Sequence, residues 1–257
     1  AETLAAVAGG FLAEISLRTP FYWQTAIAFI AIPASFALIE PKLNTNKIKA
    51  GMRHILGVVK YSLWESKSLA LNILFSSVIG CATLTMAWFL QTYLSNIHKF
   101  SEYQVGIAWS VVNLTVGLST LVAYKIEKKL GIKTTLLTIL IIVSGSYIII
   151  GLTEAAVVLA VVWLFYFIRG IATPVLKDYI NTLCEPDVRA TVLSVRNFVI
   201  RIFFSLFGPF MGWYADVFTL KQAFIASGII ILVSGSILFV MYLPYVIKEK
   251  NNSKKVE

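Results

Sequence analysis

The residues best suited to recognise a solute are polar and cationic side chains that stand inside long apolar segments. Arg169 is the clearest case, because it follows Phe165–Ile168 and precedes Gly170. A guanidinium in such a segment must pair with another group or reach water. We therefore expect Arg169, with Tyr166 and Thr173 on the same helical face, to contact an anionic or carbonyl-bearing substrate. The alternatives are a salt bridge to an acid on a neighbouring helix, or a side chain that extends toward the lipid headgroups.

Two further apolar segments carry polar residues at helical spacing. Asn72, Ser76 and Thr83 form one stripe, and Trp109 and Asn113 belong to another. Such groups must face a cavity or another helix, because an unpaired polar group in hydrocarbon is costly. We expect both stripes to line a pathway for a small-molecule substrate. The alternative is that their small and aromatic members are ordinary helix-packing residues.

Carboxylates and metal ligands are scarce in these segments. Glu14 is the one convincing embedded acid, and we expect it either to bind coupling protons or to brace the turn beside Arg18. The two histidines, His54 and His98, are predicted on opposite sides of a membrane. The sequence has no metal-ligand spacing, no Gly-x-Ser-x-Gly string and no phosphate-binding loop. It therefore favours neither an enzyme nor a metal site, and no cofactor is expected.

The elements that position these residues follow from composition. Hydrophobic residues make up 58% of the chain, charged residues only 14%, and the mean hydropathy is +0.80; a soluble domain has about 25% charged residues. An uncharged apolar run of roughly 18 residues or more is typical of a membrane span. The runs are continuous rather than alternating, which indicates helices and not a barrel. We predict an all-α, polytopic integral membrane protein with about eight transmembrane helices, at 3–17, 21–39, 69–92, 104–124, 134–152, 155–176, 196–215 and 222–245.

The basic residues between the spans predict the orientation. Seventeen fall on one side: Lys42, Lys47, Lys49, Arg53, Lys60, Lys67, Lys125, Lys128, Lys129, Lys133, Lys177, Arg189, Arg196, Lys248, Lys250, Lys254 and Lys255. The opposite side has only Arg18, Lys99 and Lys221. Because basic loops stay cytoplasmic, we predict a cytoplasmic C-terminus.

Basic residues spread between spans do not form one folded face, so nucleic acid is not expected as a partner. Lysine outnumbers arginine sixteen to six, and with no long outer loop this favours a bacterial inner membrane.

One basic segment differs from the spans. Within Asn46–Lys67, apolar residues recur at helical spacing with basic residues between them, which predicts an amphipathic helix on the membrane surface. The alternative is a partly ordered linker.

Ala1 follows no Met and no basic leader, so we expect further sequence before it. The predicted division is two helices in 1–40, a cytoplasmic linker in 41–68, six helices in 69–246 and a cytoplasmic tail in 247–257.

Several short strings in this order resemble the major facilitator superfamily. Gly9–Glu14 followed by Arg18–Tyr22 is similar to the turn between the fifth and sixth helices, and Ile39–Pro41 to the end of the sixth. Arg189–Ser194 resembles the entry to the eleventh helix, and Gly208–Asp216 its exit. The resemblance covers the whole chain and implies an N-terminally truncated major facilitator fold, with the spans as helices five to twelve. It also implies that the uncharged ninth and twelfth helices face lipid, while the seventh, eighth, tenth and eleventh surround the cavity.

The chain departs from the family's Asp-Arg-x-Gly-Arg-Arg signature between paired helices. In Glu127–Lys133 the glycine is present, but a lysine occupies the place of the acid. This departure weakens the loop as a charge-relay gate. The candidates for a cytoplasmic gate remain Lys128, Lys129, Gly131, Arg189 and Arg201.

The resemblance implies secondary transport of a small organic solute by alternating access. The aromatic and apolar cavity segments suit drug-like or amphipathic molecules, so drug or metabolite efflux is expected. Symport, antiport and uniport are left open, and a monomer in the lipid bilayer is favoured. The alternative is a non-transporting receptor or scaffold with the same fold.

Overall fold

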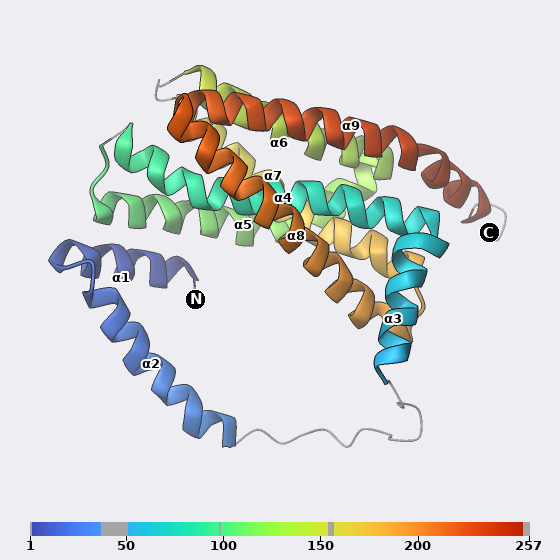
Figure 1. The fold of residues 1–257 in the computed structure, drawn as a ribbon, viewed down its shortest axis with the longest axis horizontal. Helices are drawn as coiled ribbons and strands as arrows, with labels where there is room; N and C mark the ends of the chain where they lie inside the picture. The colour runs from blue at the N-terminus through green and yellow to red at the C-terminus, as the bar shows by residue number, and fades with distance from the viewer. Residues whose placement is uncertain (1, 37–50, 98, 154–156, 254–257) are drawn as a thin grey trace.

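The computed structural model describes residues 2–36, 51–97, 99–153 and 157–253, and these residues form helices and no strands (Figure 1). The helices are α1 (Glu2–Ile15), α2 (Thr19–Phe36), α3 (Met52–Lys60), α4 (Lys67–Asn96), α5 (Glu102–Leu130), α6 (Ile132–Leu152), α7 (Val157–Leu183), α8 (Arg189–Val217) and α9 (Leu220–Ser253). A π-helical turn, η2 (Tyr61–Glu65), joins α3 to α4, and a 3₁₀ turn, η3 (Pro186–Val188), precedes α8.

Among the described residues, six helices are long and apolar enough to cross a membrane, α4 to α9. They coincide with six of the eight predicted spans. The other two predictions, 3–17 and 21–39, fall on α1 and α2, which are helical but do not belong to these six. With 14 residues, α1 is shorter than the ~20 that a span needs. Residues 37–39 of the second predicted span lie outside the described residues.

Local signals at both ends explain why α5 begins and ends where it does. The Ser101 hydroxyl accepts from the Gln104 backbone N–H at 3.3 Å, and the Gln104 side chain accepts from the Ser101 N–H at 2.9 Å. This capping box satisfies two N–H groups that the first turn would leave unpaired. At the other end Gly131 has a φ of +76°, a conformation that glycine adopts without steric cost. The chain therefore turns at Gly131 directly into α6.

The six long helices pack around one apolar core, in which α6 lies along α9 (Figure 1). Tyr93, Tyr147, Phe165 and Phe224 are fully buried there. The Tyr93 and Phe224 rings meet edge to face at 5.5 Å, and the Tyr147 hydroxyl donates to the Ala82 carbonyl at 2.6 Å. The buried Tyr147 hydroxyl has a backbone acceptor, so burying this group costs little.

The short helix α3 crosses one end of the bundle (Figure 1). Its Val58 is buried against the ends of α7 and α8, whereas Leu56 is 59% and Trp64 of η2 is 71% exposed. The amphipathic helix predicted within 46–67 therefore exists from Met52 onward, and part of its apolar face packs on the protein. Its position on the membrane surface stays a prediction. At the C-terminus α9 continues to Ser253, so the predicted tail 247–257 is helical as far as it is described.

Candidate functional site

The candidate site is built on α5 and α7, which run parallel and in close contact. A side chain at Gly170 would meet the Ser119 hydroxyl and would lie 2.6 Å from the Val116 carbonyl oxygen. The Thr120 hydroxyl donates across the same contact to the Gly170 carbonyl at 3.0 Å. Only glycine permits this approach, and the approach holds the facing side chains of the two helices in register.

Trp109, Tyr166 and Arg169 come together next to this contact. The Trp109 and Tyr166 rings meet edge to face, with centroids 5.8 Å apart and planes at 84°. The Arg169 guanidinium carbon lies 5.4 Å from the centroid of the Tyr166 ring, within the range of a cation–π interaction. Tyr166 is fully buried. Its hydroxyl has no acceptor in the described part of the chain, and the polar group beside it is the Arg169 guanidinium, which can only donate.

Arg169 is half-buried and forms no ion pair with any of the described residues. The one salt bridge among the described residues joins Lys60 to Glu65 at 3.1 Å, far along the chain from Arg169. Thr173 donates its hydroxyl hydrogen to the Arg169 carbonyl at 3.0 Å, which leaves the guanidinium unaffected. In the described residues, the intramolecular salt bridge considered as an alternative for Arg169 is therefore absent.

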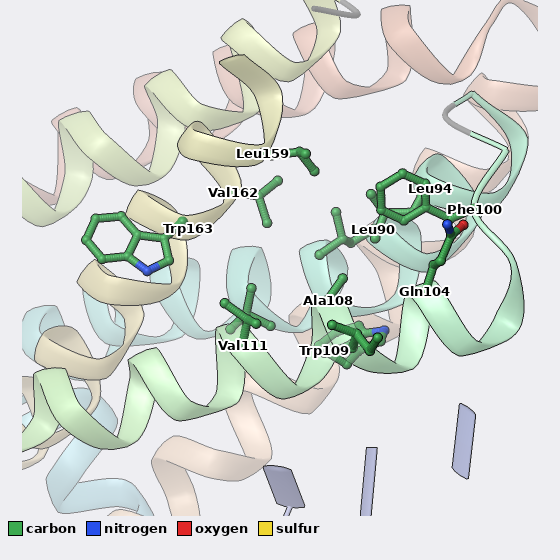
Figure 2. Close-up of a pocket in the computed structure, with 12 residues that line it drawn as sticks. Leu90, Leu94, Phe100, Gln104, Ala108, Trp109, Val111, Leu159, Val162 and Trp163 are labelled. Atoms are coloured by element: carbon green, nitrogen blue, oxygen red, sulfur yellow. The ribbon is translucent and has the colours of Figure 1, made fainter. Parts of the chain in front are cut away.

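An apolar crevice of about 350 Å³ lies beside these aromatic rings. Figure 2 shows Leu159 and Val162 of α7 on one side and Ala108 and Val111 of α5 on the other, with Leu90 of α4 at the back. Its wall also includes Trp109, Trp163, Leu94 and the amide side chain of Gln104. Since Trp109 both lines the crevice and contacts Tyr166, apolar and cationic surfaces adjoin at this position.

A second polar cluster lies apart from the first, where α4 meets α8 and α9. Arg196 is 6% exposed; its Nε donates to the Ser76 hydroxyl, and its Nη1 donates to the Asn197 side-chain oxygen at 3.2 Å. The Asn72 amide donates to the Tyr242 hydroxyl at 3.1 Å. The prediction that Arg196 lies in a basic loop is therefore wrong, because α8 begins seven residues earlier and turns Arg196 inward. Its apolar neighbours at helical spacing, Val192 and Val199, were the signal that could have placed it correctly.

The structure thus separates the predicted pathway residues into two groups. Trp109, Tyr166 and Arg169 form the first group, and Asn72 and Ser76 belong to the second. In the described part of the chain, the remaining residues form no hydrogen bond with a side chain of either group; Thr173 bonds only the Arg169 backbone carbonyl. Thr83 is half-buried and donates to the Gly80 carbonyl of its own helix at 2.8 Å, Thr173 is exposed, and Asn113 is half-buried. Glu14 is exposed on α1 and makes no ion pair with Arg18 among the described residues.

Lys128, Lys129, Gly131 and Arg189 lie at one end of the bundle, which we call the basic end and define by α3, the α5–α6 turn and the α7–α8 connection; Arg201 lies near the middle of α8. Lys128, Lys129, Arg189 and Arg201 are exposed, and Gly131 is half-buried. The sequence analysis did not identify one contact at this end, which joins α5 to α7. The Tyr179 hydroxyl donates to the Glu127 carboxylate at 2.8 Å. A polar pocket of about 340 Å³ adjoins it, and Thr120, Lys177 and Asp178 also line that pocket.

Cys184 in the α7–α8 connection is buried against the same end of the bundle. Its thiol donates to the Ile180 carbonyl at 3.2 Å. Burial raises the pKa of the Cys184 thiol, and the neighbouring Arg189 offsets part of that increase because it favours the thiolate. Arg189 therefore has a neighbour inside the protein as well as an exposed surface.

Comparisons with known proteins agree with this architecture. The family profile described as Major Facilitator Superfamily matches residues 1–207 and also residues 73–257. In Bacillus subtilis (strain 168), the protein named "Uncharacterized MFS-type transporter YceJ" is 24% identical over 74% of this chain and 48% of its own length. "Multidrug resistance protein 2" of the same organism is 23% identical over 95% of this chain and 60% of its own length. The chain therefore spans about half to three-fifths of these curated relatives.

A solved structure shares the fold. The crystal structure of a bacterial homolog of the human lysosomal transporter Spinster, in an inward-facing and unoccupied conformation, superposes with a TM-score of 0.59 at 15% identity. The match covers 93% of this chain and 64% of that chain. At this identity the likeness concerns the arrangement of helices alone.

Proposed function

Because this chain belongs to the major facilitator superfamily, an integral membrane family of transporters rather than enzymes, we propose that it takes part in moving a small organic solute by alternating access. In this proposal α4 to α9 are the family's helices seven to twelve, and α1 and α2 are its fifth and sixth. The driving force is that of a secondary transporter.

The observation that carries the proposal is the group formed by Trp109, Tyr166 and Arg169. A half-buried guanidinium without an acid partner in the described residues, inside a helix fit to span a membrane, is costly unless it meets water or a ligand. The adjacent buried Tyr166 hydroxyl has no acceptor within the described part of the chain. A polar ligand at this position would satisfy both groups.

The basic end supports a proposed orientation. The connections that carry Lys128, Lys129 and Arg189 all lie at this end, with α3 beside them, and basic connections stay on the cytoplasmic side. We place the C-terminus in the cytoplasm, the protein in a bacterial inner membrane, and the cytoplasmic gate at Lys128, Lys129, Gly131, Arg189 and Arg201. The contact between Glu127 and Tyr179 is suited to closing that gate.

Efflux is the direction we propose, and the name of Multidrug resistance protein 2 supports it. Glu14 remains the candidate for binding coupling protons. Its exposure on α1 leaves its carboxylate open to water or to further protein. The working unit is taken to be a monomer in the lipid bilayer.

Transport by proteoliposomes tests the proposal. The protein that carries this chain is reconstituted, and counterflow is measured for a panel of small organic anions, cations and neutral compounds. Arg169→Ala is expected to lower the rate of the transported compound at least tenfold. Arg18→Ala is the matched control, because Arg18 is an exposed arginine outside the site, and its rate should match the wild type.

Two results would contradict the proposal. Normal counterflow by Arg169→Ala, at normal reconstituted amounts, would remove Arg169 from the pathway. Binding of a compound without counterflow of any compound in the panel would favour the alternative of a receptor or scaffold with this fold.

A further inference from the structure

The crevice between α5 and α7 is apolar along almost its whole wall. Leu90, Leu94, Val111 and Val162 line it, and the Gln104 amide is its main polar group. At about 350 Å³, it is at the small end of ligand pockets, which measure roughly 300–1,000 Å³. A volume of this size suits an apolar body of one or two rings rather than a hydroxylated sugar.

The crevice opens toward an apolar face of α5. Ile107 and Val111 line the crevice and are exposed. Leu114 and Leu118 are also exposed and follow them at helical spacing, so these residues form one apolar stripe along α5. Since α5 stands for the family's eighth helix in the proposed function, this stripe is suited to line an apolar approach to the crevice. A solute that enters from this side must itself partition into apolar surroundings.

The other side of the Trp109–Tyr166 contact is cationic. Arg169 covers the Tyr166 ring, and no carboxylate of the described residues lies within 4.0 Å of its guanidinium. A guanidinium binds carboxylate or sulfonate oxygens through paired N–H groups in a fixed planar arrangement. A cationic ligand at this position would instead meet a like charge.

From the apolar crevice and the adjacent guanidinium, we propose that the substrate is an amphipathic organic anion. This inference rests on the proposed function. Its apolar body occupies the crevice between α5 and α7, and its carboxylate or sulfonate binds Arg169. The Tyr166 hydroxyl, buried beside Arg169 and without an acceptor in the described residues, donates to the same anionic group. Trp109 stands between the two parts and contacts the ring system of the ligand.

Binding of three compounds with one apolar body tests this inference. Equilibrium dialysis of the detergent-solubilised protein compares 2-naphthoate, 2-naphthamide and protonated 2-(aminomethyl)naphthalene. The carboxylate is expected to bind at least tenfold more tightly than the amide, and the ammonium compound more weakly than both. Arg169→Ala should reduce the preference for carboxylate over amide to about one, and Arg169→Lys should retain part of it.

Two further variants separate the apolar contribution from the charge. Ala108→Leu narrows the crevice and is expected to weaken carboxylate and amide by the same factor, which leaves their ratio unchanged. Arg18→Ala should alter neither affinity nor ratio.

Equal affinity for the carboxylate and the amide, a preference that survives Arg169→Ala, or no binding of any of the three compounds would overturn the inference. In each case counterflow of another compound from the panel would leave the proposed transport function standing. Absence of all counterflow together with the expected carboxylate preference would contradict the transport function and support the anion site.

Discussion

Arg169 and Arg196 are both arginines on membrane-spanning helices, and the described residues give neither an ion pair, yet their surroundings differ. Arg196 is almost fully buried, and its Nε and Nη1 donate to Ser76 and Asn197. Arg169 is half-buried over the Tyr166 ring, with the Tyr166 hydroxyl beside its guanidinium. The comparison teaches that a charge inside the bundle is structural where side chains of the protein accept its hydrogen bonds, and available for ligand binding where an aromatic face supports it and leaves most of its N–H groups open.

The largest expected effect concerns the contact that holds the Arg169 site together. Gly170→Val places a branched side chain against the Ser119 hydroxyl and the Val116 backbone of α5. We expect a loss of about 3 kcal/mol in unfolding free energy, since overpacking a close helix contact forces the backbones apart. Thermal unfolding in detergent and counterflow should both decline. Gly117→Val is the control, because no atom lies within 4 Å of the position that its Cβ would occupy; equal losses in both variants would contradict the tight contact between α5 and α7.

The next effect concerns Arg196, the buried arginine whose hydrogen bonds are accepted by Ser76 and Asn197. Arg196→Ala leaves a cavity and removes the donor to Ser76, so we expect a loss of about 2 kcal/mol in unfolding free energy. Arg196→Met fills the space without a charge and should recover most of that loss, because a buried cation is itself costly to desolvate. Arg201→Ala, on an exposed position of the same helix, should change the melting temperature little. If Arg169→Ala destabilises the protein as much as Arg196→Ala does, the distinction between the two arginines fails.

A smaller effect is expected at the contact between Asn72 and Tyr242, which joins α4 to α9 in the second cluster. Tyr242→Phe removes the acceptor of the Asn72 amide in a buried place, which should cost about 1 kcal/mol. The preference among substrates should stay unchanged, because this cluster is structural. Tyr245→Phe on the same helix is the control. A change in substrate preference without a change in melting temperature would assign Asn72 to the pathway after all.

The smallest expected effect is a change in the rate at which Cys184, at the basic end, reacts with a thiol reagent. In a Cys81→Ser background, maleimide should react slowly with Cys184 at pH 7 and faster as the pH rises, because burial raises the pKa of the thiol and the thiolate is the reactive form. Arg189→Ala removes a charge that favours the thiolate, so the pH profile should shift upward. A profile that shifts downward, or a rate as fast as that of a free thiol, would show that the α7–α8 connection is not packed as described.

The long helices were predictable because lipid imposes a simple requirement on a sequence. A span must be apolar over about twenty residues, and segments such as 134–152 meet that condition without reference to any neighbour. The start of α5 at Glu102 depends likewise on adjacent residues, the Ser101–Gln104 capping box. The polar stripes were predicted as one class, and only the structure separated Asn72 and Ser76 from Trp109 and Tyr166.

The sequence by itself determined where the chain becomes helical, which helices are fit for a membrane, and that Arg169 stands inside one of them, because length, hydropathy and spacing act along the chain. Tertiary structure alone decided which polar groups satisfy one another. Ser76 and Arg196 are 120 residues apart, and Trp109 meets Tyr166 from another helix. Such pairings depend on how each helix is rotated and how closely two helices approach. Contacts such as that of Gly170 with α5 set this geometry, and they form only when the bundle packs.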